Sequence, residues 1–409
     1  MKKFAISLAV MATLAAGLIA QDAEPALFPL NTGGKFGYID KAGKVVIEPH
    51  FDWAFEFCEG LALINISGQK NDYGFVIGGK WGYIDSRGSV AITPQYDDAK
   101  PFSGGLALVN IGGVRNELGI IAGGKRGYID IKGKMVIEPQ YDDARGFSEG
   151  LALVRLGDKY GYIDMNGSRV TEFKYDDGRS FKEGLALVRY NDKYGYIDKQ
   201  GREIIPVSYL DARNFQEGAA LVREKDKLGF IDFGGAVIGR MEFDDANAFC
   251  EGMAAVKKNG KWGYIDRAGN LVIDHRYDAA SDFKDGMAAV RLGGKRGFID
   301  RSGRMVVPPK YNGVQDFSEG LAAVNLGGTM NQHGYVDGGK WGFLDKTGRI
   351  VILLKFDYVM NFKNGLALIN RGGTMNAFGS VDGGQWGYIN EAGKYVWRPG
   401  QKYEPERGQ

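Results

Sequence analysis

Paired carboxylates recur along the chain after a Tyr or Phe. The pairs are Asp97 with Asp98, Asp142 with Asp143, Asp176 with Asp177, and Asp244 with Asp245. Two adjacent acids could hold a divalent cation or carry out acid–base catalysis. Calcium needs about six to eight closely spaced oxygens, and no Gly-rich ligand loop is interleaved with these pairs. Asp residues that hydrogen-bond their own backbone in turns explain the motif more simply, so we expect no metal site.

Other signatures of catalysis are missing from the sequence. It contains no nucleophile elbow, phosphate-binding loop or dinucleotide fingerprint, and His50, His275 and His333 lack the spacing of zinc ligands. We therefore expect a protein that is not an enzyme and binds no cofactor.

Four tryptophans share one context, because each precedes a Gly. They are Trp81, Trp262, Trp341 and Trp386. An exposed aromatic face could stack on a sugar ring or a cation. Packing against neighbouring segments is the alternative, and Arg126 and Arg296 at equivalent positions favour a site at the edge of the core.

Four connecting segments are eleven residues longer than the others and share an Asn/Gly template. A candidate binding residue in each is the second Asn of the template, namely Asn71, Asn116, Asn331 and Asn376. Loops on a rigid scaffold often bind ligands. A self-packed, lengthened hairpin is the alternative interpretation.

These candidates sit on ten copies of one unit. Aligned glycines at 37, 82, 127, 161, 195, 229, 263, 297, 342 and 387 are 45 or 34 residues apart, a spacing typical of repeat architectures. Each unit predicts three short antiparallel strands joined by Gly turns, followed by a connection. The aromatic residue that immediately follows each Gly is predicted to be core, and the Gly itself to face a bulge or a closely packed group.

The units resemble the WG-containing repeat, through pairs such as Trp262-Gly263 and the shared pattern Gly-Tyr-Ile-Asp. The resemblance covers residues 26 to 397 and implies a tandem β-repeat fold of a kind common in bacterial proteins. It implies no established enzymatic activity.

The arrangement of the units leaves two alternatives. A ring usually splits one unit between its termini, and a propeller blade usually has four strands, so we expect an open, curved or superhelical all-β array. A closed, propeller-like toroid is the alternative. Cys58 and Cys250 occupy the same unit position five units apart, too distant to form a disulfide in a ring or an extended array. Only a superhelix with five units per turn would bring them near each other.

The first twenty residues predict a signal peptide, with Lys2 and Lys3 before an apolar run. Residues 21–398 are then one continuous array of ten repeats, and 399–409 form a tail. Without residues 1–20 the chain has 50 basic and 50 acidic residues, which gives no net charge to attract nucleic acid. No other stretch predicts a membrane span.

We therefore expect an exported bacterial protein, located in the periplasm, in the cell envelope or outside the cell. It would be a non-enzymatic scaffold that binds another macromolecule, most simply a protein. Binding of a cell-envelope glycan through the repeated aromatic positions is the alternative.

Overall fold

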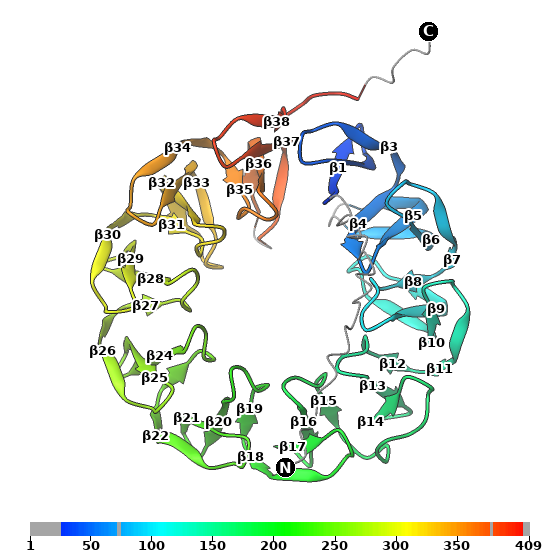
Figure 1. The fold of residues 1–409 in the computed structure, drawn as a ribbon, viewed down its shortest axis with the longest axis horizontal. Coiled ribbons are helices and arrows are strands. Elements are labelled where there is room, and N and C mark those ends of the chain that lie inside the picture. Colours follow the sequence, from blue (N-terminus) through cyan, green and yellow to red (C-terminus); the bar gives the residue numbers. More distant parts are fainter. Residues whose placement is uncertain (1–25, 72–74, 377–378, 404–409) are drawn as a thin grey trace, which may run out of the picture.

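The computed structural model describes residues 26–71, 75–376 and 379–403. Ten small antiparallel sheets follow one another around a ring (Figure 1). The prediction of an open array was therefore wrong, and the closed alternative, a ten-bladed β-propeller, is observed. The predicted signal peptide, residues 1–20, lies outside the described residues. Those residues contain no helix, and hence none that could span a membrane.

Each complete blade has a short inner strand that faces the centre of the ring (Figure 1). The inner strands are β4 (Trp53–Cys58), β8 (Asp98–Ala99), β12 (Asp143–Ala144), β15 (Asp177–Gly178), β19 (Asp211–Ala212), β23 (Asp245–Ala246), β27 (Ala279–Ala280), β31 (Gly313–Val314) and β35 (Tyr358–Val359). These strands lie in the segments predicted to be mere connections. Most are only two residues long, too short to show alternation in the sequence, which is why three strands per unit were predicted instead of four.

The second and third strands of each blade form its central hairpin. The second strands are β1 (Phe28–Thr32), β5 (Leu61–Lys70), β9 (Leu106–Arg115), β13 (Leu151–Leu156), β16 (Leu185–Tyr190), β20 (Ala220–Glu224), β24 (Met253–Lys258), β28 (Met287–Leu292), β32 (Leu321–Met330) and β36 (Leu366–Met375). The third strands are β2 (Lys35–Ile39), β6 (Val76–Ile84), β10 (Ile121–Asp130), β14 (Lys159–Asp164), β17 (Lys193–Asp198), β21 (Lys227–Ile231), β25 (Lys261–Asp266), β29 (Lys295–Asp300), β33 (Val336–Asp345) and β37 (Val381–Asn390).

The outer strands run around the rim of the ring (Figure 1). They are β3 (Val45–Phe51), β7 (Val90–Tyr96), β11 (Met135–Tyr141), β18 (Glu203–Tyr209), β22 (Val237–Phe243), β26 (Leu271–Tyr277), β30 (Met305–Tyr311), β34 (Ile350–Phe356) and β38 (Tyr395–Trp397). In blade 4 the outer segment makes only two isolated bridges to the third strand, Tyr160 with Tyr175 and Ile163 with Arg169.

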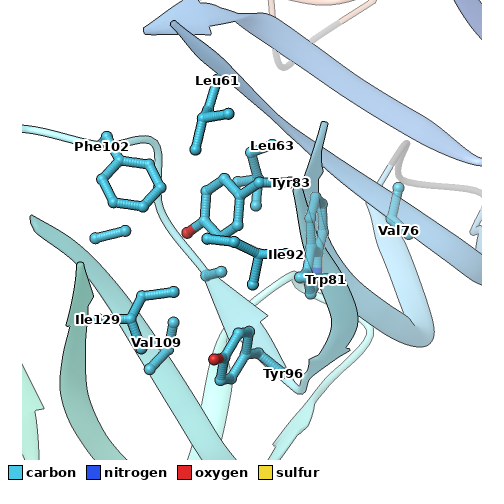
Figure 2. Close-up of a cluster of buried hydrophobic side chains, with 12 residues drawn as sticks. Leu61, Leu63, Val76, Trp81, Tyr83, Ile92, Tyr96, Phe102, Val109 and Ile129 are labelled. Atoms are coloured by element: carbon cyan, nitrogen blue, oxygen red, sulfur yellow. The ribbon is translucent and has the colours of Figure 1, made fainter. Parts of the chain in front are cut away.

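The aromatic residue that immediately follows the repeat Gly is buried in every blade, as predicted. In nine blades its ring packs against a Phe that lies in or just after the inner strand of the next blade, so that these cores are shared between neighbours. Figure 2 shows this between blades 2 and 3, where the rings of Tyr83 and Phe102 are 4.9 Å apart. Val109 and Ile129 of blade 3 belong to the same cluster. No blade has a complete core alone, which explains the repetition.

The repeat Gly has the predicted local cause. At Gly127 the register between β10 and β11 shifts, and a Cβ there would lie 2.5 Å from the Ile137 carbonyl oxygen. Because that oxygen belongs to the backbone of the adjacent outer strand, it cannot move aside as a side chain could. Any larger residue would therefore force the two strands apart.

The ring closes without a shared sheet. Within the residues that the structure describes, blade 1 consists of β1, β2 and β3, and blade 10 is built from β35 to β38. Their contact is a cluster of side chains that includes Phe28 and Leu30 of β1 with Tyr388 and Trp397 of blade 10. Beyond β38, Tyr403 donates a hydrogen bond to Glu48 in β3, at 2.5 Å. Closure by packing explains why no unit is split between the two ends of the sequence.

Candidate functional site

The paired carboxylates connect blades. The first Asp of each pair lies where its carboxylate reaches the preceding blade: Lys125 of blade 3 donates to Asp142 Oδ1 at 2.5 Å. The Gly157 amide, in the hairpin turn of blade 4, donates to Asp142 Oδ2 at 2.8 Å. The hydrogen bond from Lys125 lowers the pKa of Asp142. Equivalent ion pairs link Lys80 with Asp97, Lys159 with Asp176, Lys227 with Asp244, and Lys261 with Asp278.

The structural interpretation of these acids is supported, although their partners are neighbouring blades and not mainly their own turns. Within the described part of the chain, no three His, Cys, Asp or Glu side chains are grouped to hold a metal ion. Cys58 and Cys250 are free thiols, on blades 2 and 7.

The four long segments are lengthened hairpins on blades 2, 3, 9 and 10. At their turns the candidate Asn side chains accept backbone hydrogen bonds: Asn116 Oδ1 accepts from the amides of Leu118 and Ile120, both at 3.0 Å. Corresponding bonds reach Asn71 from Phe75, Asn331 from Tyr335 and Asn376 from Ser380. These Asn oxygens shape the turns, and a direct role of the residues in binding stays a prediction.

A second set of Asn residues in the same hairpins is buried. It comprises Asn65, Asn110, Asn325 and Asn370. Each donates across its hairpin to a Gly carbonyl, as Asn325 does to Gly338 at 3.2 Å. The Asn-x-Gly-Gly template therefore encodes a self-packed widening of the hairpin.

The four tryptophans of the repeat have different environments. Trp81 and Trp341 are only 4% exposed and belong to the core, which leaves almost no ring surface for a ligand. Trp262 and Trp386 are partly buried. Lys257 lies 6.0 Å from the Trp262 ring centre, whereas Trp386 lines a large cavity.

That cavity lies beside β1, where the described part of the chain forms no inner strand, and its volume is about 1290 Å³. Its walls come from β1, from the inner strand β4 of blade 2, and from blade 10. It exceeds the roughly 300–1,000 Å³ of most small-molecule pockets. The cavity therefore has room for a segment of a larger molecule.

Aromatic side chains concentrate in this cavity. Trp53 and Phe55 on β4 line it together with Phe36, whose ring is 5.0 Å from that of Trp53. Phe55 is 40% exposed. Five other blades have Asp at the position of Trp53, and Lys or Arg replaces Phe55 in four of them.

Trp53 and Phe55 were not among the predicted site residues, because the repeat pattern shows only what the units share. They could have been found as departures from the repeat, because they are apolar residues at positions where most other blades have polar ones. On the facing wall, Met360 occupies the same unit position as Phe55 and is 50% exposed.

Charged groups surround the aromatic surface. Lys363 of blade 10 forms an ion pair with Glu56 of blade 2, and so crosses blade 1. Both side chains are more than half exposed, so the pair stabilises this arrangement only weakly. On β4's side, Lys35 pairs with Asp52 at 2.5 Å. Burial raises the pKa of Tyr388, which keeps its hydroxyl protonated and able to donate to the Pro29 carbonyl at 2.8 Å.

Solved structures share no more than a general likeness with this fold. A eukaryotic initiation factor is 10% identical with a TM-score of 0.49, covering 81% of this chain and 96% of its own. Hsv2p of Kluyveromyces lactis is 12% identical with a TM-score of 0.33, covering 61% and 96%. An extracellular domain assigned to a hybrid two component system of B. thetaiotaomicron is 9% identical with a TM-score of 0.29, covering 90% and 62%.

No curated protein matches the sequence. The WG containing repeat, in contrast, matches nine segments that together span most of the ring: residues 36–69, 81–114, 127–160, 160–194, 194–227, 229–262, 262–295, 297–329 and 341–374. Together with the ten blades built on the repeat Gly, these matches show that the chain belongs to the WG-containing repeat family.

Proposed function

We propose that this propeller is a non-enzymatic, exported scaffold that binds a protein partner in the cavity between blades 10, 1 and 2. One observation carries the proposal: among the described residues, the one blade without an inner strand coincides with a large cavity lined by aromatic side chains, of which Phe55 is exposed. Aromatic residues are enriched in the central parts of protein interfaces. At each of the other nine blade junctions, an aromatic pair of the protein's own side chains spans the two blades.

The charge pattern supports a macromolecular partner over a small anion or cation. Glu56 and Asp52 carry negative charge at the cavity, and Lys70 and Lys363 carry positive charge. The apolar surface between them is continuous from Trp53 to Phe55, whose rings are 6.5 Å apart. An apolar centre with charges at its margin is the usual anatomy of a protein interface.

Site-specific photo-crosslinking tests this proposal. A photoreactive phenylalanine replaces Phe55 in one variant, and Arg213, its equivalent on blade 6, in a matched control. After irradiation of cells that make each variant, we expect a protein adduct from position 55 only, and suppression of that adduct by excess unmodified protein. Absence of an adduct, or identical adducts from both positions, would contradict the proposal.

The same experiment distinguishes the glycan alternative. An adduct that peptidoglycan hydrolases convert to a smaller species would place a wall polymer in the cavity, and would replace the protein partner by a glycan. A third variant with the photoreactive residue at Leu118, which is 59% exposed on the β9–β10 hairpin, tests whether the long hairpins contact the same partner.

A further inference from the structure

Among the described residues no inner strand lies beside β1, so main-chain groups on that edge of β1 face no neighbouring strand. In blade 3 the Lys100 amide donates to the Leu108 carbonyl, and the Asp97 amide donates to the Asn110 carbonyl, both at 3.0 Å. Leu108 pairs with Tyr128 in the blade 3 hairpin, as Pro29 pairs with Tyr38 in blade 1. Pro29 and Asn31 therefore direct their carbonyl groups toward the cavity.

One aromatic position is missing at the same place. Nine blades supply the ring of an aromatic pair that spans a junction: Tyr38–Phe57, Tyr83–Phe102, Tyr128–Phe147, Tyr162–Phe181, Tyr196–Phe215, Phe230–Phe249, Tyr264–Phe283, Phe298–Phe317 and Phe343–Phe362. Tyr388 is the tenth ring, and its described neighbour is Phe28 of β1, at 5.8 Å. The Phe that would complete the pattern would have to come from an inner strand of blade 1.

The hydroxyl of Tyr388 donates its hydrogen bond to a different acceptor, the Pro29 carbonyl of β1. In blade 4 the Tyr162 hydroxyl donates to the inner-strand carbonyl of Arg179 at 2.7 Å and also lies 3.4 Å from the Leu187 carbonyl of the second strand. Pro29 is the counterpart of Leu187. Tyr388 therefore uses the acceptor that remains when the inner-strand carbonyl is missing.

The chain's own sequence is poorly suited to fill the gap. Counting back from β1 by the repeat places Leu18 where the other units have the first Asp, and Ala23 where they have the buried Phe. Blade 10 is altered as well: Gln385 replaces the Lys that pairs with this Asp, and Asn364 replaces the Glu that holds the next turn. With Gln385 and Asn364 at these two positions, a segment that binds at this junction needs no charged side chain opposite them.

We propose that an extended peptide segment of a protein partner binds in this cavity as the fourth strand of blade 1, antiparallel to β1, with an aromatic side chain against Tyr388. The proposal rests on the proposed function and specifies its ligand. Strand addition at a free sheet edge obtains affinity from main-chain hydrogen bonds and specificity from side-chain pockets. Here the edge is the open side of Pro29 and Asn31, and the pocket is the space beside Tyr388, Trp53 and Phe55.

A peptide from the protein's own repeats is the direct probe. The segment Tyr141–Gly150, YDDARGFSEG, forms the inner strand and aromatic residue of blade 4. We expect a fluorescently labelled copy to bind the purified full chain saturably, as followed by anisotropy. The same peptide with Ala in place of Phe147 should bind at least 10-fold more weakly.

Two substitutions in β1 separate main-chain pairing from side-chain contact. Asn31→Pro removes the amide proton on the open edge and should weaken binding at least 10-fold, whereas Asn31→Ala keeps that proton and should leave binding within 2-fold. Circular dichroism and the midpoint of thermal unfolding establish that both variants are folded. Slower hydrogen exchange at the Asn31 amide in the complex provides an independent readout.

Strand addition is wrong if the repeat peptide does not bind, if it binds as well without its Phe, or if Asn31→Pro and Asn31→Ala behave alike. The crosslinking result separates the failure of strand addition from the failure of the proposed function. A protein adduct at position 55 without peptide binding would leave the cavity as a protein site and exclude the strand mode. Absence of both would remove the proposed function as well.

Discussion

The junctions of this ring fall into two kinds, nine that are complete and one that is not. At a complete junction such as that between blades 5 and 6, an inner strand adds to the sheet and Tyr196 packs on Phe215 and donates to the Arg213 carbonyl. Glu183 also accepts the amides of Glu217 and Gly218. Between blades 10 and 1, side-chain packing around Phe28 replaces all three interactions. In the described part of the chain, the ring therefore tolerates one junction at which the following blade has no inner strand, and the large cavity lies there.

The largest difference between the two kinds should be in their buried aromatic residues. Phe283 is fully buried beside Tyr264, so Phe283→Ala should lower the free energy of unfolding by about 3–5 kcal/mol. Phe55→Ala, in the open junction, should change it by about 0.5 kcal/mol or less, as an exposed surface substitution does. Urea denaturation compares them. Equal losses would mean that Phe55 is a core residue and that the cavity is closed in solution.

The second-largest loss in the free energy of unfolding should come from the carboxylates that accept backbone amides from the following blade. Glu217 accepts the Glu251 amide at 2.7 Å and the Gly252 amide at 2.8 Å, so Glu217→Ala should cost about 1–2 kcal/mol because hydrogen bonds to a charged group are lost. Asn364→Ala, at the same position in blade 10, should have almost no effect on chemical denaturation. A loss in the free energy of unfolding for Asn364→Ala similar to that for Glu217→Ala would show that the Asn364 side chain also stabilises the last junction.

Removing a Tyr hydroxyl should have a smaller effect. Tyr196→Phe removes one hydrogen bond to a buried carbonyl, and should cost about 0.5–1.5 kcal/mol. Tyr388→Phe should cost a similar amount in the free protein, because Tyr388 has found a substitute acceptor in Pro29. Thermal unfolding with and without the repeat peptide sharpens the comparison, since only Tyr388→Phe should also weaken peptide binding. An unchanged affinity would argue against contact between the peptide and this hydroxyl.

The smallest effect should appear in the pH dependence. The hydrogen bond from Lys227 lowers the pKa of Asp244 in the folded protein. The pair therefore stabilises the fold above the unfolded pKa of Asp, and this contribution is lost as the pH falls through the lower, folded value. Asp244→Asn should slightly reduce the difference in unfolding midpoint between pH 7 and pH 3. At Asn312, where blade 9 already has Asn, Asn312→Ala should leave that difference unchanged.

Much of the blade could be predicted from the sequence. The core position of Tyr264, the bulge at the repeat Gly and the Gly turns follow from local patterns that ten copies repeat. Ring closure could not be predicted, because it depends on the small rotation between blades and on contacts between residues as distant as Pro29 and Tyr388. No local pattern encodes either quantity.

The candidate site was found only in part. Trp386 was predicted from its motif and lines the cavity, whereas Trp53 and Phe55 were overlooked because they depart from the repeat. Trp81 has the same motif as Trp386 and is buried. Trp262 also has this motif and is partly buried beside blade 8, which has an inner strand. The motif therefore fixes the position of the ring within its blade but not its exposure.

The lengthened hairpins have a consequence for orientation. They occur on blades 9, 10, 2 and 3 and so flank blade 1 on both sides. The hairpins of blades 2 and 3 touch, since Asn71 donates to the Glu117 carbonyl at 2.6 Å, and a Cβ at Gly379 of blade 10 would overlap the Tyr335 ring of blade 9. A ring of ten equal blades could bind a partner in ten equivalent orientations about the ring axis. Because the lengthened hairpins occupy one arc of this ring only, the ten blades are not equivalent. A large partner that contacts these hairpins would meet the cavity at blade 1 in one rotational alignment.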